Sequence, residues 1–452
     1  MKPSLILINP WITDFAAYDL WSKPVGLLYL AAHLRKRGCS VHLIDCLDVH
    51  HPLMKEKGPL PLPKRRSYGT GKFWREKVSK PPPLKDIPRP YSRYGLWPKI
   101  VEQELAEIDS PSAILVTSLM TYWYPGVQEV IRLAKKIHPG VPVILGGIYA
   151  RLCSEHAAIH SGADTVISDH GFDSLWTCLK AINIDLAEDA DPALPSPYPA
   201  FDLLKGLDYV CIMTSTGCPF RCKYCASHYL YLEFCRRDPA EALEEIIYWR
   251  RAFGVRDFAF YDDALLANPE THALPLLEGL ARLDLDLRFH TPNALHVRGI
   301  TPEIARLMRR TGFKTIRLGL ESSDMALHRE LDNKISPGDF EHAMRHLKKA
   351  GFSPRHIGAY ILIGLPEQPI DAIVETIRFA GGHGAFPYLA EYSPVPHTLL
   401  WEKAVSWSNY DLTGEPLFHN NTLLPCWDEA RKGCLPKLKR LVAETRERLR
   451  QE

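Results

Sequence analysis

The chain has 452 residues, of which 46% are hydrophobic and 24% charged, a composition typical of a soluble globular protein. Its length exceeds what one ordinary hydrophobic core holds, so we expect two or three domains. The net charge of +2 argues against a broad nucleic-acid surface, and no apolar stretch approaches the roughly 20 residues of a membrane span.

The first 184 residues alternate short apolar runs with amphipathic segments, the pattern of a parallel α/β sheet. We expect strands at 4–9, 40–46, 113–118, 141–147 and 163–168, and helices at 24–38, 127–138 and 172–182. Residues 49–98 interrupt this pattern with proline, basic and aromatic residues, which indicates a surface insertion or, alternatively, a lid or substrate-recruiting arm. The elements predict a doubly wound, Rossmann-like domain over residues 1–184.

A second series of elements follows an acidic, proline-rich linker at 185–204. Strands are expected at 208–214, 257–262, 286–290, 315–321, 356–364 and 388–393. Helices are expected at 239–254, 302–312, 339–351 and 370–382. Six repeats of this kind predict an open, partial (β/α)6 barrel over 205–400 rather than a closed eight-stranded barrel, followed by a helical C-terminal tail at 401–452.

The stretch "STGCPFRCKYCASHYL" (215–230) places Cys218, Cys222 and Cys225 in a C-x3-C-x2-C pattern on one loop. Structural zinc takes four ligands, and His228 is the one nearby candidate for a fourth. Three thiolates also suffice for three irons of a [4Fe–4S] cluster, which leaves one iron open to a small molecule. The loop follows the first barrel strand, at the face where barrel enzymes place their chemistry. The sequence therefore favours an iron–sulfur cluster.

The other cysteines do not extend this motif. An auxiliary cluster at Cys235, Cys426 and Cys434 is a weaker alternative, because thiols far apart in sequence are more often ordinary buried residues. The eleven cysteines are not spaced as a secreted disulfide scaffold, and the N-terminus lacks a signal-peptide pattern. We therefore expect a cytoplasmic protein.

The cysteine motif, with Tyr224 before its last cysteine and a βα barrel after it, resembles the radical SAM superfamily. The resemblance implies that S-adenosylmethionine (SAM) binds the open iron. One electron would then cleave it to a 5′-deoxyadenosyl radical that abstracts hydrogen from an unactivated carbon. It also implies a one-electron reductant such as flavodoxin or ferredoxin, and a small-molecule or peptide substrate.

Four strand-end segments extend the resemblance, namely "YDDALL", "TPNAL", "LGLES" and "ILIGLPEQ". In the family, such segments contact the methionine amino group, the ribose and the adenine of SAM. Carried over residue by residue, the resemblance assigns SAM contacts to Tyr224, Asp262, Asp263, Asn293, Glu321, Ser322 and Gly364.

The N-terminal domain resembles the cobalamin-binding domain of one radical SAM branch, through residues 24–46 and 143–171. The resemblance assigns cobalamin contacts to Thr117, Ser118, Tyr122, Trp123, Gly146 and Gly147. The aromatic run at 122–124 either stacks on the corrin or fills the pocket. The loop after the first strand has no histidine, and "DVHHPL" (48–53) follows the second strand instead, so any cobalamin is expected to lack a protein histidine ligand.

The union of the two domains predicts cobalamin-dependent methylation of an unactivated carbon. A radical SAM rearrangement, cyclisation or oxidation without cobalamin is the first alternative. A non-enzymatic iron–sulfur binding or electron-transfer protein is the second.

Overall fold

The computed structural model describes residues 2–57, 62–187, 197–283 and 285–451. The chain divides into two compact units, the first formed by Met1–Asp208 with Glu415–Leu417, and the second by Tyr209–Gly414 with Phe418–Glu452. Part of the expected linker, 188–196, and part of the expected insertion, 58–61, lie outside the described residues. Each unit is considered by itself.

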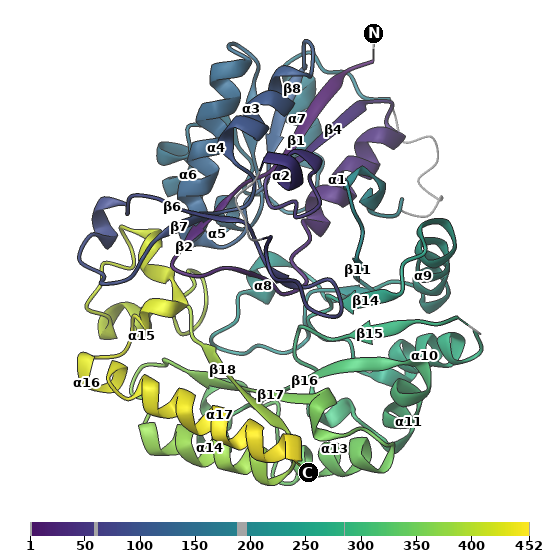
Figure 1. The fold of residues 1–452 in the computed structure, drawn as a ribbon, viewed down its shortest axis with the longest axis vertical. Coiled ribbons are helices and arrows are strands. Elements are labelled where there is room, and N and C mark those ends of the chain that lie inside the picture. The colour runs from purple at the N-terminus through teal and green to yellow at the C-terminus, as the bar shows by residue number, and fades with distance from the viewer. Residues whose placement is uncertain (1, 58–61, 188–196, 284, 452) are drawn as a thin grey trace. The chain divides into compact units, whose positions relative to one another are not determined.

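The first unit is built on a five-stranded parallel sheet in the order β10-β9-β8-β1-β4. Its strands are β1 (Ser4–Asn9), β4 (Ser40–Asp45), β8 (Ala113–Val116), β9 (Val143–Leu145) and β10 (Thr165–Val166). Helices α1 (Val25–Lys36) and α7 (Asp173–Ala181) pack on one face, and α3 (Pro98–Ala106) and α4 (Tyr124–Ile137) lie on the other (Figure 1). The doubly wound prediction is confirmed, and the direction of strand order reverses between β1 and β8, where such sheets bind ligands.

The insertion has more structure than the sequence indicated. Strand β2 (Ile12–Asp14), from the loop after β1, pairs with β7 (Ser92–Tyr94), which pairs in turn with β6 (Arg75–Lys77). Strand β3 (Tyr18–Asp19) likewise pairs with β5 (Gly71–Lys72). The insertion therefore builds two small antiparallel sheets onto the loop after β1, one of three strands and one of two. Strands of two or three residues are too short to show a two-residue periodicity.

The second unit contains a six-stranded parallel sheet in the order β11-β14-β15-β16-β17-β18. The strands are β11 (Tyr209–Ile212), β14 (Asp257–Phe260), β15 (Arg288–His290), β16 (Phe313–Glu321), β17 (Ile357–Ile363) and β18 (Phe386–Glu391). The sheet is open in the described part of the chain, with β11 and β18 at its edges, as predicted.

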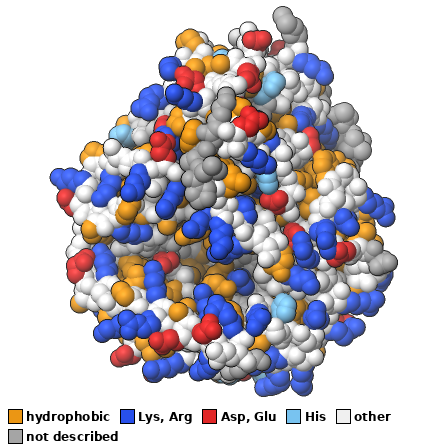
Figure 2. Space-filling model, in the orientation of Figure 1, with side chains coloured by type: hydrophobic (Ala, Val, Ile, Leu, Met, Phe, Trp, Pro, Cys, Tyr) orange, Lys and Arg blue, Asp and Glu red, His pale blue; other side chains and the backbone are white. Residues whose placement is uncertain are grey.

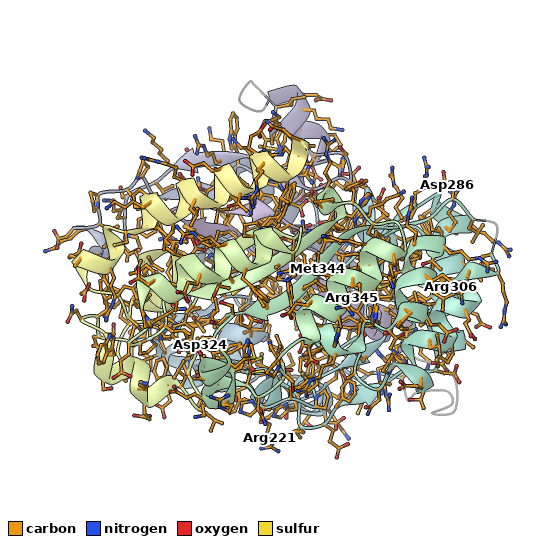
Figure 3. All side chains as sticks on the ribbon, turned by 90° about the horizontal axis from the view of Figure 1, so that it is seen from below. Arg221, Asp286, Arg306, Asp324, Met344 and Arg345 are labelled. Atoms are coloured by element: carbon orange, nitrogen blue, oxygen red, sulfur yellow. The ribbon has the colours of Figure 1, made fainter. Side chains whose placement is uncertain are left out.

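Helices follow the strands of the second unit and lie along the outer side of the sheet (Figure 1). They are α9 (Pro239–Phe253), α10 (Ala273–Ala281), α11 (Pro302–Thr311), α13 (Asp339–Lys349) and α14 (Ile370–Gly382), with α17 (Leu435–Gln451) after β18. The sequence did not predict α10, because apolar residues occupy nearly all of its sides and leave no clear period. On α13, by contrast, Met344 is buried and the adjacent Arg345 is exposed (Figure 3).

Local signals explain why these helices begin and end where they do. The Asp238 carboxylate accepts a hydrogen bond from the Ala240 amide at the start of α9, and Gly254 ends that helix at φ +70°. Thr301 caps α11 in the same manner, and Gly312 ends it at φ +96°. Side-chain oxygens satisfy unpaired amides at a helix start, and glycine adopts the left-handed terminus without strain.

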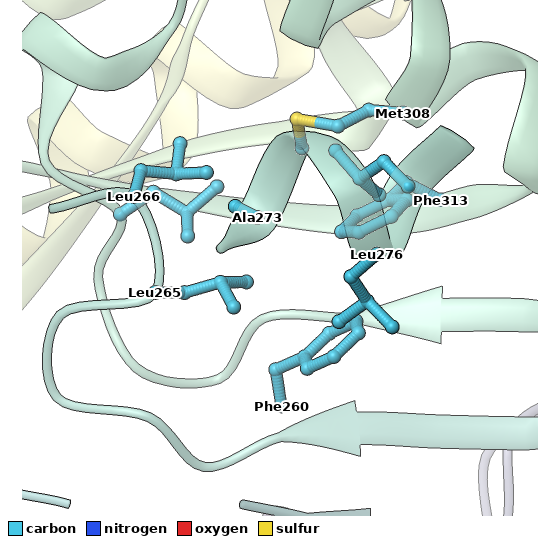
Figure 4. Close-up of a pocket in the computed structure, with 9 residues that line it drawn as sticks. Phe260, Leu265, Leu266, Ala273, Leu276, Met308 and Phe313 are labelled. Carbon is cyan, nitrogen blue, oxygen red and sulfur yellow. The ribbon is translucent and has the colours of Figure 1, made fainter. Parts of the chain in front are cut away.

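A cavity of about 10 Å³ lies in the second unit and is lined by side chains such as Phe260, Leu265, Met308 and Phe313 (Figure 4). Its lining is apolar, so it offers no partners to a polar cofactor or to water. It is a packing defect of the core rather than a ligand site.

The surface carries mixed charges. Figure 2 shows Lys and Arg side chains spread over one face among acidic and hydrophobic ones, which agrees with the small net charge of +2. Within the described residues, no helix combines the length and the apolar character needed to span a membrane.

Candidate functional site

The cysteine loop lies between β11 and the short helix α8 (Ser227–Leu230). Cys222 is 7% exposed, while Cys218 and Cys225 are half-buried. Two backbone hydrogen bonds of Lys223 hold the middle of the loop in place. The Lys223 amide donates to the Leu331 carbonyl, and the Lys223 carbonyl accepts from the Leu400 amide, each at 2.8 Å. The loop is therefore held between two other segments of the unit.

The three thiols share one electrostatic environment. Burial raises the pKa of Cys218 to about 11 and that of Cys222 to about 12, and the charge of Cys225 adds to both shifts. The Ser227 amide lies 3.4 Å from the Cys225 sulfur and donates to it. The positive charge of Lys334 lowers the pKa of all three thiols, against burial.

The three cysteines and their surroundings have the chemistry of an iron–sulfur cluster site. Within the described residues, no three His, Cys, Asp or Glu side chains converge as they would around a metal ion. However, three neighbouring thiols, a backbone amide donor and a nearby cation are the groups that stabilise iron-bound thiolates. Because the free thiols hold their protons, binding of iron would release them.

The paired acids after β14 have different surroundings. Asp262 is 4% exposed and accepts hydrogen bonds from the Thr214 amide at 3.1 Å, the Thr214 hydroxyl at 2.6 Å and the Ser215 hydroxyl at 2.6 Å. Asp263 is half-buried and accepts one bond, from the Ser227 hydroxyl at 2.6 Å. Burial raises the pKa of both carboxyl groups. Asp262 thus fastens the start of the cysteine loop, and Asp263 retains more capacity for a ligand.

The other residues assigned to SAM also follow strands of this sheet. Asn293 donates to the Tyr261 carbonyl at 2.8 Å, which links the ends of β15 and β14. Ser322 is buried, and its hydroxyl accepts from the Asp324 amide at 3.0 Å. Gly364 has φ +91°, and a Cβ there would approach a Leu424 methyl group at 3.1 Å. Their roles as SAM contacts remain predictions.

In the first unit, small residues shape the carboxyl ends of β8 and β9. The fully buried Ser118 hydroxyl donates to the Gly146 carbonyl at 2.6 Å, and the Thr117 amide donates to the Ile8 carbonyl at 3.1 Å. Gly147 has φ +94°, and a Cβ there would clash with the backbone of Ser118. A Cβ on Gly146 would meet no atom within 4 Å. The edge is therefore open at Gly146, which fits the close approach of a large ligand.

The aromatic run at 122–124 packs mainly into the first unit. Tyr122 and Tyr124 are 6% and 8% exposed. The half-buried Trp123 donates through Nε1 to Asp14 at 2.7 Å and packs beside a cluster that includes Ile12. Contact of Tyr122 or Trp123 with cobalamin remains a prediction.

The two histidines after β4 are each paired with a carboxylate of the same unit. His50 lies 2.8 Å from Asp208, and His51 lies 3.1 Å from Glu104. Each pairing uses the Nε2 atom of its imidazole. That neither histidine is a cobalt ligand remains a prediction.

Comparison with known proteins finds two family matches, one in each compact unit of the chain. The radical SAM superfamily matches residues 212–380, and the B12 binding domain matches residues 96–175. The chain carries a radical SAM domain preceded by a B12-binding domain. These domains imply a [4Fe–4S] cluster, SAM and cobalamin as cofactors, which confirms the cofactors predicted from the sequence.

Two curated relatives show how far the likeness of sequence extends. An uncharacterized methyltransferase of Pyrococcus horikoshii is 24% identical over 346 residues, which cover 69% of this chain and 74% of that protein. The hopanoid C-2 methylase of Rhodopseudomonas palustris is 27% identical over 225 residues, which cover 45% of this chain and 42% of that protein.

Two solved structures are similar in fold. TsrM from Kitasatospora setae, a radical S-adenosylmethionine methyltransferase solved with tryptophan and a SAM analogue, gives a TM-score of 0.65 at 16% identity and covers 90% of this chain and 78% of that one. The cobalamin-dependent radical enzyme OxsB gives a TM-score of 0.55 at 12% identity and covers 92% of this chain and 57% of that one. At these identities the likeness establishes the fold alone.

The radical SAM domain contains a buried charged residue that sequence reasoning missed. Lys334 is 8% exposed and donates to the Tyr224 hydroxyl and to Glu321 Oε1, both at 2.9 Å. Burial would lower the pKa of Lys334, but the charges of Glu321, Cys222 and Asp332 raise it. Glu321 itself has φ +56°, which is rare for a residue with a side chain. No local motif marks Lys334, because most lysines lie on the surface.

A buried imidazolium supports the same network. His328 Nδ1 lies 3.0 Å from Asp332, and its Nε2 lies 2.9 Å from the Ser322 carbonyl. Both partners are acceptors, so both ring nitrogens donate and the ring is charged. Burial would lower the pKa of His328, but the bond to Asp332 raises it. The positive charges of His328 and Lys334 thus offset the negative charges of Asp332 and Glu321.

His296 is a second residue that the sequence did not single out. Its ring packs on Phe220, between the first two cysteines, with centroids 4.3 Å apart. Burial lowers the pKa of His296 to about 4, so this ring is neutral near pH 7. The cysteine loop thus contacts one neutral ring, that of His296, and one charged side chain, that of Lys334.

Proposed function

We propose that this protein is a cobalamin-dependent radical SAM methyltransferase that acts on an unactivated carbon of a small-molecule or peptide substrate. The observation that carries the proposal is the three-cysteine loop, with acids at the adjoining strand ends, in one chain with a B12-binding domain. The first relative described above is named as a methyltransferase. The proposal includes a one-electron reductant such as flavodoxin or ferredoxin and a reducing cytoplasm.

In this proposal Cys218, Cys222 and Cys225 hold the cluster. When bound, the cofactors supply reductive cleavage of SAM to a 5′-deoxyadenosyl radical and a carrier for the methyl group. The half-buried carboxylate of Asp263 accepts a hydrogen bond from the ammonium group of SAM, and the opposite charges strengthen that bond. Lys334 holds the Glu321 carboxylate in place for the ribose hydroxyls. Asp262 keeps the cysteine loop in place through Thr214 and Ser215.

The test is anaerobic reconstitution with iron, sulfide and hydroxocobalamin, followed by incubation with methyl-labelled SAM and dithionite. We expect cobalamin and the cluster to stay with the protein through gel filtration, and both 5′-deoxyadenosine and S-adenosylhomocysteine to form. Failure to retain cobalamin at any supplied concentration would exclude this route. Absence of 5′-deoxyadenosine with a full cluster would favour a binding or electron-transfer protein.

Two neighbouring acids give a sharper test of the SAM site. Asp263→Asn removes the proposed charge and should weaken SAM binding about 10- to 100-fold, since hydrogen bonds to charged groups contribute about 1.5–3 kcal/mol. Its melting temperature should stay unchanged. Asp262→Asn should instead lower the melting temperature and the iron content, because it disrupts three bonds to the cysteine loop. If Asp263→Asn binds SAM as tightly as the wild type does, Asp263 does not contact SAM.

One observation favours a second candidate, a radical SAM reaction without cobalamin. Tyr122 is buried and Trp123 is engaged with Asp14, so these rings already have partners within the first unit. Under this alternative, Trp123→Ala leaves turnover unchanged and the protein retains no cobalamin. Under the methyltransferase proposal, cobalamin is retained by the wild type, and its loss in any variant abolishes methyl transfer but not 5′-deoxyadenosine formation.

A further inference from the structure

His397 has a backbone conformation that its side chain disfavours. It lies in the loop after β18 with φ +67°, in the left-handed region that glycine adopts without cost. Residues held in this region persist only where their surroundings enforce the conformation, and they cluster at ligand sites. A histidine at this position therefore indicates a role for the imidazole ring itself, since glycine would adopt the same backbone without strain.

The imidazole of His397 stacks on Tyr229. The two ring centroids are 4.0 Å apart, and the ring planes differ by only 3°. Tyr229 belongs to α8, which begins two residues after the third cysteine, and its amide bonds to the Ala226 carbonyl at 2.9 Å. The ring pair therefore lies about one helical turn, or roughly 5 Å along the helix, from the cysteine loop.

The loop that carries His397 is fastened to the cysteine loop. The Leu400 amide donates to the Lys223 carbonyl at 2.8 Å, between the second and third cysteines. The position of the imidazole is thus tied to that of the cluster ligands and does not depend on the ring stack alone.

Exposed apolar side chains flank the ring pair in sequence on both segments. Leu399 is 64% exposed, Leu232 is 76% exposed and Tyr231 is 36% exposed, while His397 itself is exposed. Large apolar side chains left in water beside a reactive site are typical of a surface that receives a ligand.

We propose that Tyr229 and His397 form a stacking platform for a planar, conjugated ring of the substrate. This inference rests on the proposed radical SAM function and adds a substrate class to it. Two parallel π systems present a flat face, and planar rings gain more from such a face than saturated rings of equal size. The left-handed backbone and the ring stack occur at the same residue, His397.

The test uses the reconstituted full chain with SAM bound and two matched probes. Naphthalene-2-carboxylate is planar, whereas decahydronaphthalene-2-carboxylate has the same charge and carbon skeleton but is saturated. Binding is measured by calorimetry and by protein-observed NMR. We expect the planar probe to bind more tightly than the saturated one to the wild type.

His397→Gly removes the ring and relieves the backbone. It should weaken the planar probe about two- to tenfold, the range expected from aromatic stacking, and leave the saturated probe unchanged. His397→Phe should keep the planar preference. The melting temperature of His397→Gly should equal or exceed that of the wild type, so lost binding would not reflect unfolding. Asn183→Gly is the matched control, because Asn183 has φ +60° on the first unit, far from the ring pair in sequence.

Two outcomes would overturn the platform: equal affinity of the planar probe for His397→Gly and the wild type, or no planar preference in the wild type. Formation of 5′-deoxyadenosine and the iron content are measured in the same samples. If the wild type cleaves SAM but shows no planar preference, the platform alone is wrong. If the wild type cleaves no SAM, the proposed function is wrong whatever the probes show.

Discussion

Lys334→Met is the most informative single change, because it removes one cation from a buried network while keeping the length of the side chain. Lys334 is 8% exposed and bonds Glu321 at 2.9 Å, with Asp332 at 3.8 Å. Removing one partner of a buried ion pair costs about 3–5 kcal/mol, since it leaves a carboxylate desolvated and uncompensated. Asp332 keeps its bond to His328, so we expect the lower end, about 3 kcal/mol.

This free energy corresponds to a large change in melting temperature. For units of 150–250 residues, 1 kcal/mol lowers the midpoint by about 2–4 °C, so Lys334→Met should melt about 6–12 °C below the wild type. The measurement is differential scanning calorimetry of the metal-free protein. The double variant Lys334→Met/Glu321→Gln should recover part of the loss, because it also removes the uncompensated charge.

The matched control is Lys403→Met. Lys403 also pairs with two carboxylates, Glu367 at 2.6 Å and Glu330 at 3.6 Å, but its side chain is 38% exposed. Solvent screens such a pair, so the variant should lose less than about 1 kcal/mol. If the two lysine variants melt within about 2 °C of each other, burial does not decide the strength of these pairs and the reasoning fails.

Three further predictions concern the two cofactor sites and pH. Cys222→Ser should leave the reconstituted protein with little iron, whereas Cys235→Ser, at an exposed thiol outside the motif, should retain the wild-type iron content by colorimetric assay. Gly147→Ala should destabilise the first unit by at least about 1–3 kcal/mol through strain at φ +94°, while Gly146→Ala, whose Cβ meets open space, should melt as the wild type does. His328 has a raised pKa in the folded state, so its stabilising effect is complete below about pH 6.5 and is lost as pH rises through the folded value. The difference in melting temperature between the wild type and His328→Gln should therefore shrink from pH 6 to pH 9, and a constant difference would exclude a charged ring.

The main sheets were predictable because their strands are buried on both faces. Ser4–Asn9 and Ile357–Ile363 read as continuous apolar runs, which is typical of parallel strands covered by helices. The pairing of Ile12–Asp14 with Ser92–Tyr94 was not predictable, because three residues carry no period and their partner is about 80 positions away. Pairing at that range depends on tertiary contacts rather than local propensity.

Some residues of the candidate site were likewise predictable from the sequence, and others were not. The spacing of the cysteines was legible, since a cluster requires several thiolates on one loop. The difference between Asp262 and Asp263 was not legible, because adjacent acids look alike until hydrogen bonds from Thr214 and Ser215 single out the first. Lys334 was equally hidden, because only burial among carboxylates separates it from a surface lysine.

Strand β16 ends at a left-handed residue, Glu321, and the neighbouring strand β17 is followed directly by another, Gly364, at very different energetic cost. Gly364 adopts φ +91° freely, whereas Glu321 at φ +56° follows an irregularity in the pairing of β16 and pays a steric penalty. The bond from Lys334 to Glu321 Oε1 offsets that penalty, and the same ammonium group bonds Tyr224 between the second and third cysteines. One cation thus fixes both the strand end assigned to the ribose and the loop assigned to the cluster. Loss of Lys334 should therefore impair SAM affinity and cluster stability together, whereas loss of His328, which touches neither Glu321 nor Tyr224 through a hydrogen bond among the described residues, should impair stability first.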